Sequence, residues 1–218
     1  MDPLLEVLRS GRLMVSDGAW GTMLHSAGLP PGQCPELWNI ENPSPVRSIA
    51  SEYAAAGADA LCIETMSATD EAELAIRAAK ETTALPVVCT FTFDAIAGGG
   101  YRTMMGVAPA DAARAARAAG ADILGTNCGN GLSGMVEIIR EIRAALPDVP
   151  LLVHANAGRP RRVGDHDEFP ETPSDMATQV KGLLDAGCSV IGGCCGTTPG
   201  HIRAIREAMD ACFPGLQR

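Results

Sequence analysis

Short apolar runs alternate along the chain with alanine-rich segments of helical pattern. The six apolar runs are predicted to be buried strands and lie at residues 13–17, 60–64, 87–91, 123–127, 151–155 and 189–193. Helices are predicted between them, at residues 45–56, 69–82, 109–119, 131–146, 172–186 and 199–213. Buried strands that alternate with helices indicate βα units and a parallel sheet.

Several predicted helices carry boundary signals. Ser44 and Thr198 each precede a proline, which places a hydroxyl at the N-cap and proline at the first helical position. The sequence Ala-Gly-Ala-Asp occurs at 56–59 and 119–122, and Ala-Gly-Cys at 186–188. Three helices are therefore predicted to end on glycine directly before a strand.

Polar, glycine-rich segments follow most of the predicted strands, for example Asn-Cys-Gly-Asn-Gly at 127–131. In parallel α/β folds the active site lies at this carboxyl edge of the sheet. A doubly wound sheet would show the same alternation. However, no G-x-G-x-x-G follows the first predicted strand, and the sequence has no P-loop lysine.

The composition is ordinary for a globular protein, with 46% hydrophobic and 20% charged residues. The formal net charge of −9 argues against nucleic acid as a partner, because phosphate contacts need clustered lysine and arginine. The basic cluster at 159–162 is interpreted as a solvated loop. No secretory signal and no apolar stretch approaching the roughly 20 residues of a membrane span are recognised. We therefore expect one domain over residues 1–218, without membrane contact, in the cytoplasm and with its eight cysteines reduced.

Two adjacent cysteines, Cys194 and Cys195, lie in GGCCGTTPGH at 192–201, directly after the last predicted strand. Cys128 follows the fourth predicted strand of the same sheet. If the two strands are neighbours, the three sulfurs converge above the carboxyl edge. Three thiolates with one open position suit zinc, which prefers tetrahedral nitrogen and sulfur ligands and keeps a place for substrate in catalytic sites.

The remaining cysteines have a simpler interpretation. Free cysteine is often a small buried hydrophobe, and Cys62, Cys89, Cys188 and Cys212 are expected to pack in this way. Cys34 lies in a loop rich in proline and glycine. For Cys128 taken alone, packing and metal binding are equally good explanations.

Other side chains are candidates for the same site. His154 ends a predicted strand and is expected either to line the site or to be packed and hydrogen-bonded. His201 is given no role. The three methionines Met66, Met104 and Met105 are expected to pack.

Five segments carry a family resemblance: DGAWGTML at 17–24, IET at 63–65, GTNCGNG at 125–131, HANAGRP at 154–160 and GGCCGTTPGHI at 192–202. They resemble the homocysteine S-methyltransferase family, which includes the homocysteine-binding module of cobalamin-dependent methionine synthase and the betaine and S-methylmethionine enzymes. The resemblance runs from about residue 13 to residue 206. GGCCGT with an upstream NC is its most specific motif.

The resemblance implies a TIM-like parallel βα barrel that carries a zinc ion. The family's three zinc cysteines map onto Cys128, Cys194 and Cys195. Its acidic residues, which face the amino-acid end of homocysteine, map onto Asp17 and Glu64.

Three further residues complete the predicted substrate-binding set, namely Gly18, Asn127 and Asn156. Asn156 is expected either to lend an oxygen to zinc when substrate is absent or to form a turn. No catalytic residue beyond the zinc site is assigned, because methyl transfer to a thiolate needs no general base at the transfer step.

The implied reaction moves a methyl group to the sulfur of homocysteine and gives methionine. GTNCGNG and HANAGRP look closer to the cobalamin-dependent branch, so the expected donor is methylcobalamin, presented as a methylated corrinoid on a separate corrinoid-binding protein. Betaine or S-methylmethionine as donor, another thiol as acceptor, and a non-catalytic zinc- and thiol-binding subunit of a methyltransferase assembly are the alternatives.

The chain departs from the family in length. Family members place two more βα units between segments like EYAAAGAD and DALCIET, which are fused here at 52–65. Six predicted strands in place of eight imply a shortened or open barrel, since closure links strand number to tilt and shear. Ala60, Leu61 and Ile63 are expected to be poorly covered at the sheet edge. A homodimer is predicted to bury them, with residues 1–12 or the loop at 28–43 as the alternative cover.

Overall fold

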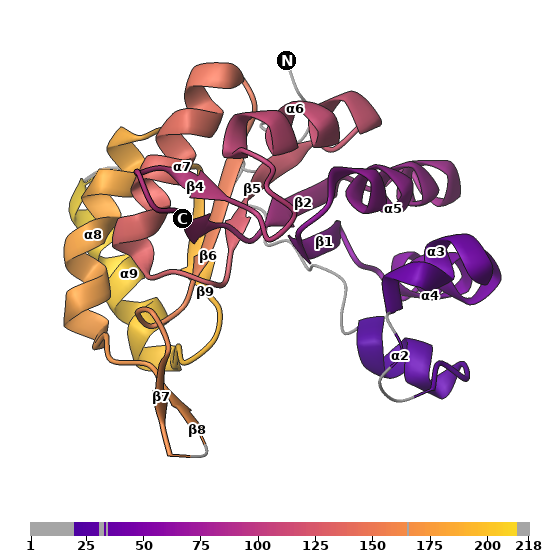
Figure 1. Cartoon of the computed structure of the whole chain (residues 1–218), viewed down its shortest axis with the longest axis horizontal. Helices are drawn as coiled ribbons and strands as arrows, with labels where there is room; N and C mark the ends of the chain where they lie inside the picture. The colour runs from indigo at the N-terminus through magenta and orange to yellow at the C-terminus, as the bar shows by residue number, and fades with distance from the viewer. Residues whose placement is uncertain (1–19, 31–32, 34, 165, 213–218) are drawn as a thin grey trace.

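The computed structural model describes residues 20–30, 33, 35–164 and 166–212 and contains a five-stranded parallel sheet (Figure 1). Its strands are β1 (Leu61–Met66), β2 (Val87–Phe91), β5 (Ile123–Asn127), β6 (Leu151–Ala155) and β9 (Val190–Gly193), side by side in that order. Each is parallel to its neighbours. Within the described residues the sheet is open, because β1 and β9 each have a single neighbouring strand.

Helices cover one face of this sheet. The long ones are α4 (Pro43–Ala55), α5 (Thr69–Thr82), α6 (Pro109–Ala119), α7 (Leu132–Ala145), α8 (Pro173–Asp185) and α9 (Pro199–Cys212). α5 lies against β1 and β2, α6 against β2 and β5, α7 against β5 and β6, and α9 against β9, with α8 packed between α7 and α9. No helix in the described part of the chain is long and apolar enough to cross a membrane.

The predicted βα alternation is confirmed. All five predicted strands that fall on described residues are present, with bounds that differ by two residues at most, whereas the strand predicted at 13–17 lies outside the described residues. α9 begins at Pro199 as predicted, but α4 begins at Pro43, two residues before the proline that follows Ser44. α6 ends on Gly120, which has φ 113° and accommodates the left-handed turn into β5 without a steric penalty.

Two short hairpins were missed from the sequence. β3 (Asp94–Ala95) pairs with β4 (Tyr101–Arg102) after β2, and β7 (Arg161–Val163) pairs with β8 (His166–Glu168) after β6. The second hairpin contains most of the basic cluster that was predicted to be a loop. Its β7 residues are exposed as expected, and the hairpin projects away from the sheet in Figure 1.

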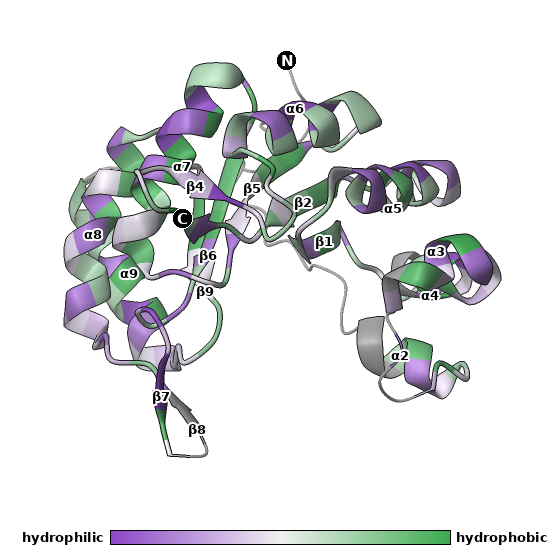
Figure 2. Cartoon of the chain, in the orientation of Figure 1, coloured by the Kyte–Doolittle hydropathy of each residue, from purple (hydrophilic) through white to green (hydrophobic). Residues whose placement is uncertain are grey.

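The two faces of the sheet bury separate cores. The face under the helices holds the main core, which includes Leu61, Phe91 and Val153. The opposite face holds a smaller cluster of Val88, Ile123 and Leu152. In Figure 2 β2 is largely green, β4 is purple, and the helices carry both green and purple residues. The cluster under the helices is much the larger of the two, so the helix-covered face is the principal source of hydrophobic stabilisation.

The edge beside β1 is better covered than the sequence suggested. Ala60 and Leu61 are buried, so the expectation that they would be poorly covered is wrong for both, whereas Ile63 is half-buried. α2 (Trp20–Ser26), the 3₁₀ turn η1 (Pro35–Leu37) and α3 (Trp38–Glu41) precede α4, and Leu24, Trp38 and Ile49 form a satellite cluster there. The homodimer stays a prediction.

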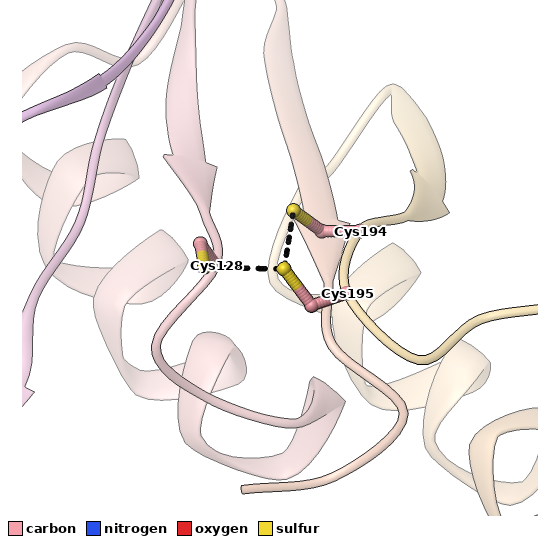
Figure 3. Close-up of side chains that lie close together, drawn as sticks. All are labelled: Cys128, Cys194 and Cys195. Carbon is pink, nitrogen blue, oxygen red and sulfur yellow. Dashed lines mark hydrogen bonds between the residues drawn. The ribbon is translucent and has the colours of Figure 1, made fainter. Parts of the chain in front are cut away.

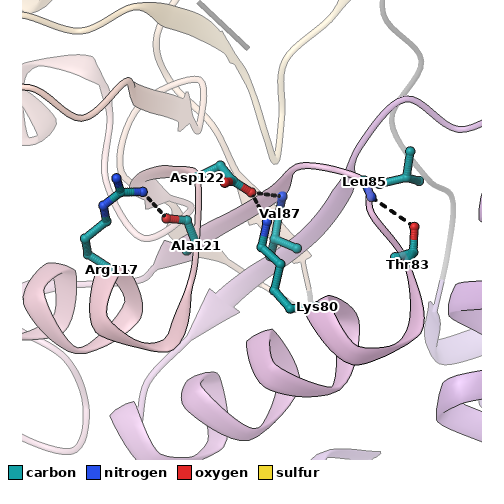
Figure 4. A network of polar contacts seen from close by, with 7 residues as sticks. All are labelled: Lys80, Thr83, Leu85, Val87, Arg117, Ala121 and Asp122. Atoms are coloured by element: carbon teal, nitrogen blue, oxygen red, sulfur yellow. Dashed lines mark hydrogen bonds and ion pairs between the residues drawn. The ribbon is translucent and has the colours of Figure 1, made fainter. Parts of the chain in front are cut away.

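A polar clamp ties the amino ends of the sheet to the helix layer (Figure 4). The carboxylate of Asp122, just before β5, accepts a hydrogen bond from the backbone N–H of Val87 at 2.7 Å. The same carboxylate forms an ion pair with Lys80 of α5. The backbone N–H of Asp122 in turn donates to the Val87 carbonyl at 2.8 Å. This edge lies opposite the predicted site, so the clamp is expected to serve stability.

We expect Asp122→Ala to destabilise the protein by about 1–3 kcal/mol, because it leaves the partly buried N–H of Val87 without its acceptor. Lys80→Ala should cost at most about 1 kcal/mol, as only a partly exposed ion pair is lost. Urea unfolding measures both. Arg114→Ala, which removes an exposed ion pair with Asp111 on α6, is the matched control with an effect within about 0.5 kcal/mol. An equal decrease in the free energy of unfolding in all three variants would contradict a stabilising role of the Asp122 contacts.

Candidate metal centre

The structure brings Cys128, Cys194 and Cys195 together at the carboxyl edge of the sheet (Figure 3). The three sulfurs lie within 4.8 Å of one another, and the Sγ of Cys195 is 3.9 Å from the Sγ atoms of Cys128 and Cys194. Cys128 follows β5, and the adjacent pair follows β9. β6 separates these two strands, so the sulfurs meet across the end of an intervening strand.

The chain that continues from β6 holds all three cysteines. The backbone N–H of Cys128 donates to the His154 carbonyl at 3.0 Å, and that of Cys194 donates to the Ala155 carbonyl at 2.7 Å. The carbonyl of Cys195 accepts from the N–H of Ala157 at 3.0 Å. The parallel ladder thus continues past the strand ends and fixes the backbone from which each sulfur projects.

Two side chains complete this support. The Oδ1 atom of Asn156 accepts a hydrogen bond from the backbone N–H of Cys195 at 3.1 Å, and Asn156 is itself buried. The hydroxyl of Thr197 donates to the Cys194 carbonyl at 2.7 Å. Backbone and side-chain contacts within the protein therefore fix the position of the loop that carries the CC pair.

Glycine is required at two positions of the cysteine loop. Gly196 has φ 77°, and a Cβ atom there would lie 2.3 Å from the ring of Phe169. A Cβ atom on Gly193 would lie 2.4 Å from the Thr197 hydroxyl oxygen. The glycines around the CC pair therefore let the loop turn tightly against β9 and the segment before α8.

The three sulfurs fit a tetrahedral ion. With zinc–sulfur bonds of about 2.3 Å, two ligands of a tetrahedral site lie about 3.8 Å apart. Burial, followed by the nearby Cys128 and Cys195 thiols, raises the pKa of Cys194 to about 12, and burial together with Cys128 also raises the pKa of Cys195. Neutral thiols are thus favoured when the site lacks a cation, and a dication offsets the repulsion among three thiolates. The cluster is consistent with a zinc site.

His201 has a structural function that sequence reasoning missed. It is buried at the start of α9, where its Nδ1 accepts from the backbone N–H of Thr198 at 3.1 Å and its Nε2 lies 2.9 Å from the Glu171 carbonyl. In this arrangement Nε2 can donate to the Glu171 carbonyl while Nδ1 accepts from the helix cap. The signal in the sequence was a threonine at the helix cap followed by histidine three residues later, in TTPGH.

The other predicted site residues occupy different environments. Asp17 and Gly18 lie outside the described residues. Glu64 is exposed near the end of β1, while the side chain of Asn127 is buried at the end of β5. His154 is half-buried beside Gly192, and burial lowers its pKa more than the nearby Glu64 carboxylate raises it. Their predicted contacts with substrate stay predictions, as does metal binding by the cysteines.

Several packing expectations can be compared directly with burial. Met66 is buried as expected, but Met104 and Met105 are 84% and 67% exposed, so the expectation that these two pack is wrong. They are the two central residues of a turn after β4, which is closed by a hydrogen bond from the backbone N–H of Gly106 to the Thr103 carbonyl at 2.8 Å, and their side chains project from that turn into solvent.

Of the cysteines expected to pack, Cys89 and Cys188 are buried, and burial raises the pKa of each to about 12. Cys62 is half-buried. Cys212 is exposed at the end of α9, which contradicts the expectation. Cys34 lies outside the described residues.

Known structures with a similar fold include the homocysteine methyltransferase MmuM from Escherichia coli. Its apo form aligns with a TM-score of 0.57 over 95% of this chain and 100% of that one, and its oxidised form with a TM-score of 0.58. Sequence identity is 17% in both cases, so the likeness concerns the fold. The expected TIM-like fold in shortened form is thus confirmed.

Sequence comparisons point in the same direction. Methionine synthases from Mycobacterium leprae and Mycobacterium tuberculosis are each 37% identical to this chain, over 97 and 91 residues. These segments cover 44% and 41% of this chain but only 8% of each relative. A profile of the family described as homocysteine S-methyltransferase matches residues 54–209, which is more than half of the sequence. The chain belongs to the homocysteine S-methyltransferase family.

Proposed function

We propose that this protein transfers a methyl group to the sulfur of homocysteine, with zinc held by Cys128, Cys194 and Cys195. The observation that carries the proposal is the convergence of three cysteine sulfurs within 4.8 Å at the carboxyl edge of a parallel sheet. The sulfurs come from two loops and leave one side of a tetrahedral site without a protein ligand among the described residues. That arrangement is typical of a catalytic and not of a closed structural zinc site.

The chain's own residues bind and orient the substrate in this proposal. Asp17 and Glu64 would hold the amino group of homocysteine, and the exposure of Glu64 beside the cysteine edge supports that role. When bound, zinc would keep the substrate sulfur deprotonated, which is the nucleophilic form of a thiol. Orientation of that sulfur toward the methyl group is the remaining task of the protein.

The proposed methyl donor is a methylated corrinoid on a separate protein. Two observations support this choice: the sequence relatives named above are methionine synthases, and the sheet is open within the described residues, which leaves room for a bulky donor. We place the reaction in the cytoplasm, because three metal-binding thiols require a reducing compartment.

The purified protein is expected to hold about one zinc ion per chain. Cys194→Ser and Cys195→Ser should each reduce the zinc content strongly, since three thiolate ligands become two. Metal analysis after gel filtration measures this, and Cys212→Ser, at an exposed cysteine on α9, is the control that should retain zinc. Full zinc content in either loop variant would refute the ligand assignment.

Zinc affinity is expected to rise with pH between about 6 and 8. The thiol of Cys194 has a pKa of about 12 and that of Cys195 is also raised, so both carry protons in this range and a metal must displace them. Each displaced proton makes the apparent affinity about tenfold tighter per pH unit, or roughly 100-fold for two protons. Competition with a chelator of known pH dependence measures the slope, and a flat profile contradicts proton-linked binding.

Glu64→Gln and Asp17→Asn are expected to weaken homocysteine binding about tenfold or more while zinc stays bound, because each removes a charge that faces the amino group. Calorimetry on the zinc-loaded protein measures binding. Glu73→Gln, at an exposed ion pair on α5, is the control. Unchanged affinity in both site variants would show that neither carboxylate orients the substrate.

The reaction itself is tested with a donor panel of methylcobalamin, betaine and S-methylmethionine, each supplied with homocysteine and zinc. Methionine is expected with methylcobalamin. Product formed only with betaine or S-methylmethionine would overturn the choice of donor. Absence of methionine with all three donors would instead favour the non-catalytic, thiol-binding subunit.

A further inference from the structure

The end of β1 is irregular next to Glu64. Ile63 pairs with Cys89 and Met66 pairs with Phe91, so β1 contains one more residue than β2 between these two pairs. The extra residue falls at Glu64 and Thr65. Bulges of this kind re-aim side chains and are common beside active sites.

The backbone of Thr65 is strained. Its φ angle is 63°, in the left-handed region that glycine adopts freely and that a β-branched residue such as threonine adopts at a steric cost. Such a conformation persists only where the surroundings hold it in place. The question is therefore which contacts compensate for the strain at Thr65.

The side chain of Asn127 supplies those contacts. Its Oδ1 accepts a hydrogen bond from the backbone N–H of Thr65 at 2.8 Å and another from the Thr90 hydroxyl at 2.7 Å. Its Nδ2 donates to the Thr65 hydroxyl at 2.7 Å. Asn127 and Thr90 are both 0% exposed, so the bond between them is shielded from water, whereas the two bonds to Thr65 are part-buried.

Asn127 also precedes Cys128 directly, and Cys128 has a left-handed backbone of its own, with φ 59°. One buried amide therefore joins the bulge that presents Glu64 to the turn that presents a cysteine of the metal cluster. Both acceptor positions of the amide oxygen and one N–H of Nδ2 are engaged within the protein, which gives the amide a means to act on the substrate through Thr65 and Glu64.

We propose that Asn127 is a positioning residue, which locks Thr65 in its left-handed conformation and so fixes Glu64 at a set distance from the cysteine cluster. This inference rests on the proposed function in so far as Glu64 binds the amino group of homocysteine. Asn127 then determines selectivity for an amino-acid thiol over a plain alkanethiol, although it contacts neither.

The test is a double substitution. Asn127→Ala should lower Tm by roughly 5–10 °C, because it leaves three hydrogen-bonding groups unpaired and the strain uncompensated. Thr65→Gly alone should cost less than Asn127→Ala, since relief of the strain at φ 63° offsets the loss of the hydrogen bond from Asn127 Nδ2 to the Thr65 hydroxyl. In the double variant, Thr65→Gly should recover at least half of the decrease in Tm that Asn127→Ala causes. No restoration would overturn the proposal.

The matched control is Asn130→Ala. Asn130 is a second buried asparagine at the same edge, but its Nδ2 donates to the Phe93 carbonyl at 2.6 Å and not to Thr65. Thr65→Gly should restore nothing in that background. Equal restoration in both backgrounds would show that glycine at 65 stabilises the protein generally, and would contradict a specific coupling to Asn127.

A second readout separates positioning from simple stabilisation. Cobalt(II) is bound in place of zinc, and its absorption bands follow binding of DL-homocysteine or 1-propanethiol. Asn127→Ala should lower the affinity for homocysteine about tenfold and change the affinity for propanethiol by no more than about twofold. Addition of Thr65→Gly to this variant should recover part of the affinity for homocysteine. Equal weakening of both thiols would contradict the proposal.

The two ideas fail in different ways. If the parent protein binds homocysteine no better than propanethiol, the proposed substrate is wrong, and the restoration of Tm still decides whether Asn127 locks Thr65. If Asn127→Ala yields no folded protein, the amount of folded protein in the double variant decides. Recovery by Thr65→Gly supports the proposal that Asn127 holds Thr65 in its left-handed conformation, and failure to recover contradicts it.

Discussion

The parallel hydrogen-bond ladder does not stop where β5, β6 and β9 end, and the whole cysteine site depends on its extension. His154 and Ala155 at the end of β6 accept from the backbones of Cys128 and Cys194, and Ala157 just past β6 donates to that of Cys195. Beyond the end of a sheet, backbone groups that face the interior need partners. Here the loops that carry the sulfurs supply those partners. The same hydrogen bonds therefore satisfy the backbone and bring the three cysteines together.

Buried asparagines extend this arrangement from backbone to side chains. Asn127 connects the ends of β1 and β5, Asn130 connects the loop after β2 to the start of α7, and Asn156 connects the ends of β6 and β9. An amide can accept and donate at once, which suits a position between two loops. These amides link the loops of the carboxyl edge to one another, whereas the amino edge relies on the ion pair and backbone contacts of Asp122.

Most of the fold was predictable because strands such as Val87–Phe91 and helices such as Pro109–Ala119 have uniform apolar patterns and glycine or proline at their ends. The hairpins after β2 and β6 were not predictable, since each strand has only two or three residues and no period can be measured over so short a length. The cysteine cluster was predicted from cysteines at two strand ends, the glycines around the CC pair and the family resemblance, although the assumption that the two strands are neighbours is wrong, because β6 lies between them. The proposed positioning role of Asn127 was not predictable, because it depends on the φ angle of Thr65, a residue 62 positions earlier in the chain.

Cys195 is exposed, and its sulfur lies within 4.8 Å of the other two sulfurs of the cluster. A site of three thiolates discriminates well against hard cations such as magnesium and calcium, but poorly among soft ones, for which copper exceeds zinc in intrinsic affinity. In the proposed site the identity of the metal would then depend on which ion is free in the compartment where the chain folds. The fold would fix the geometry of the ligands, and cellular metal homeostasis would provide the selectivity among soft cations.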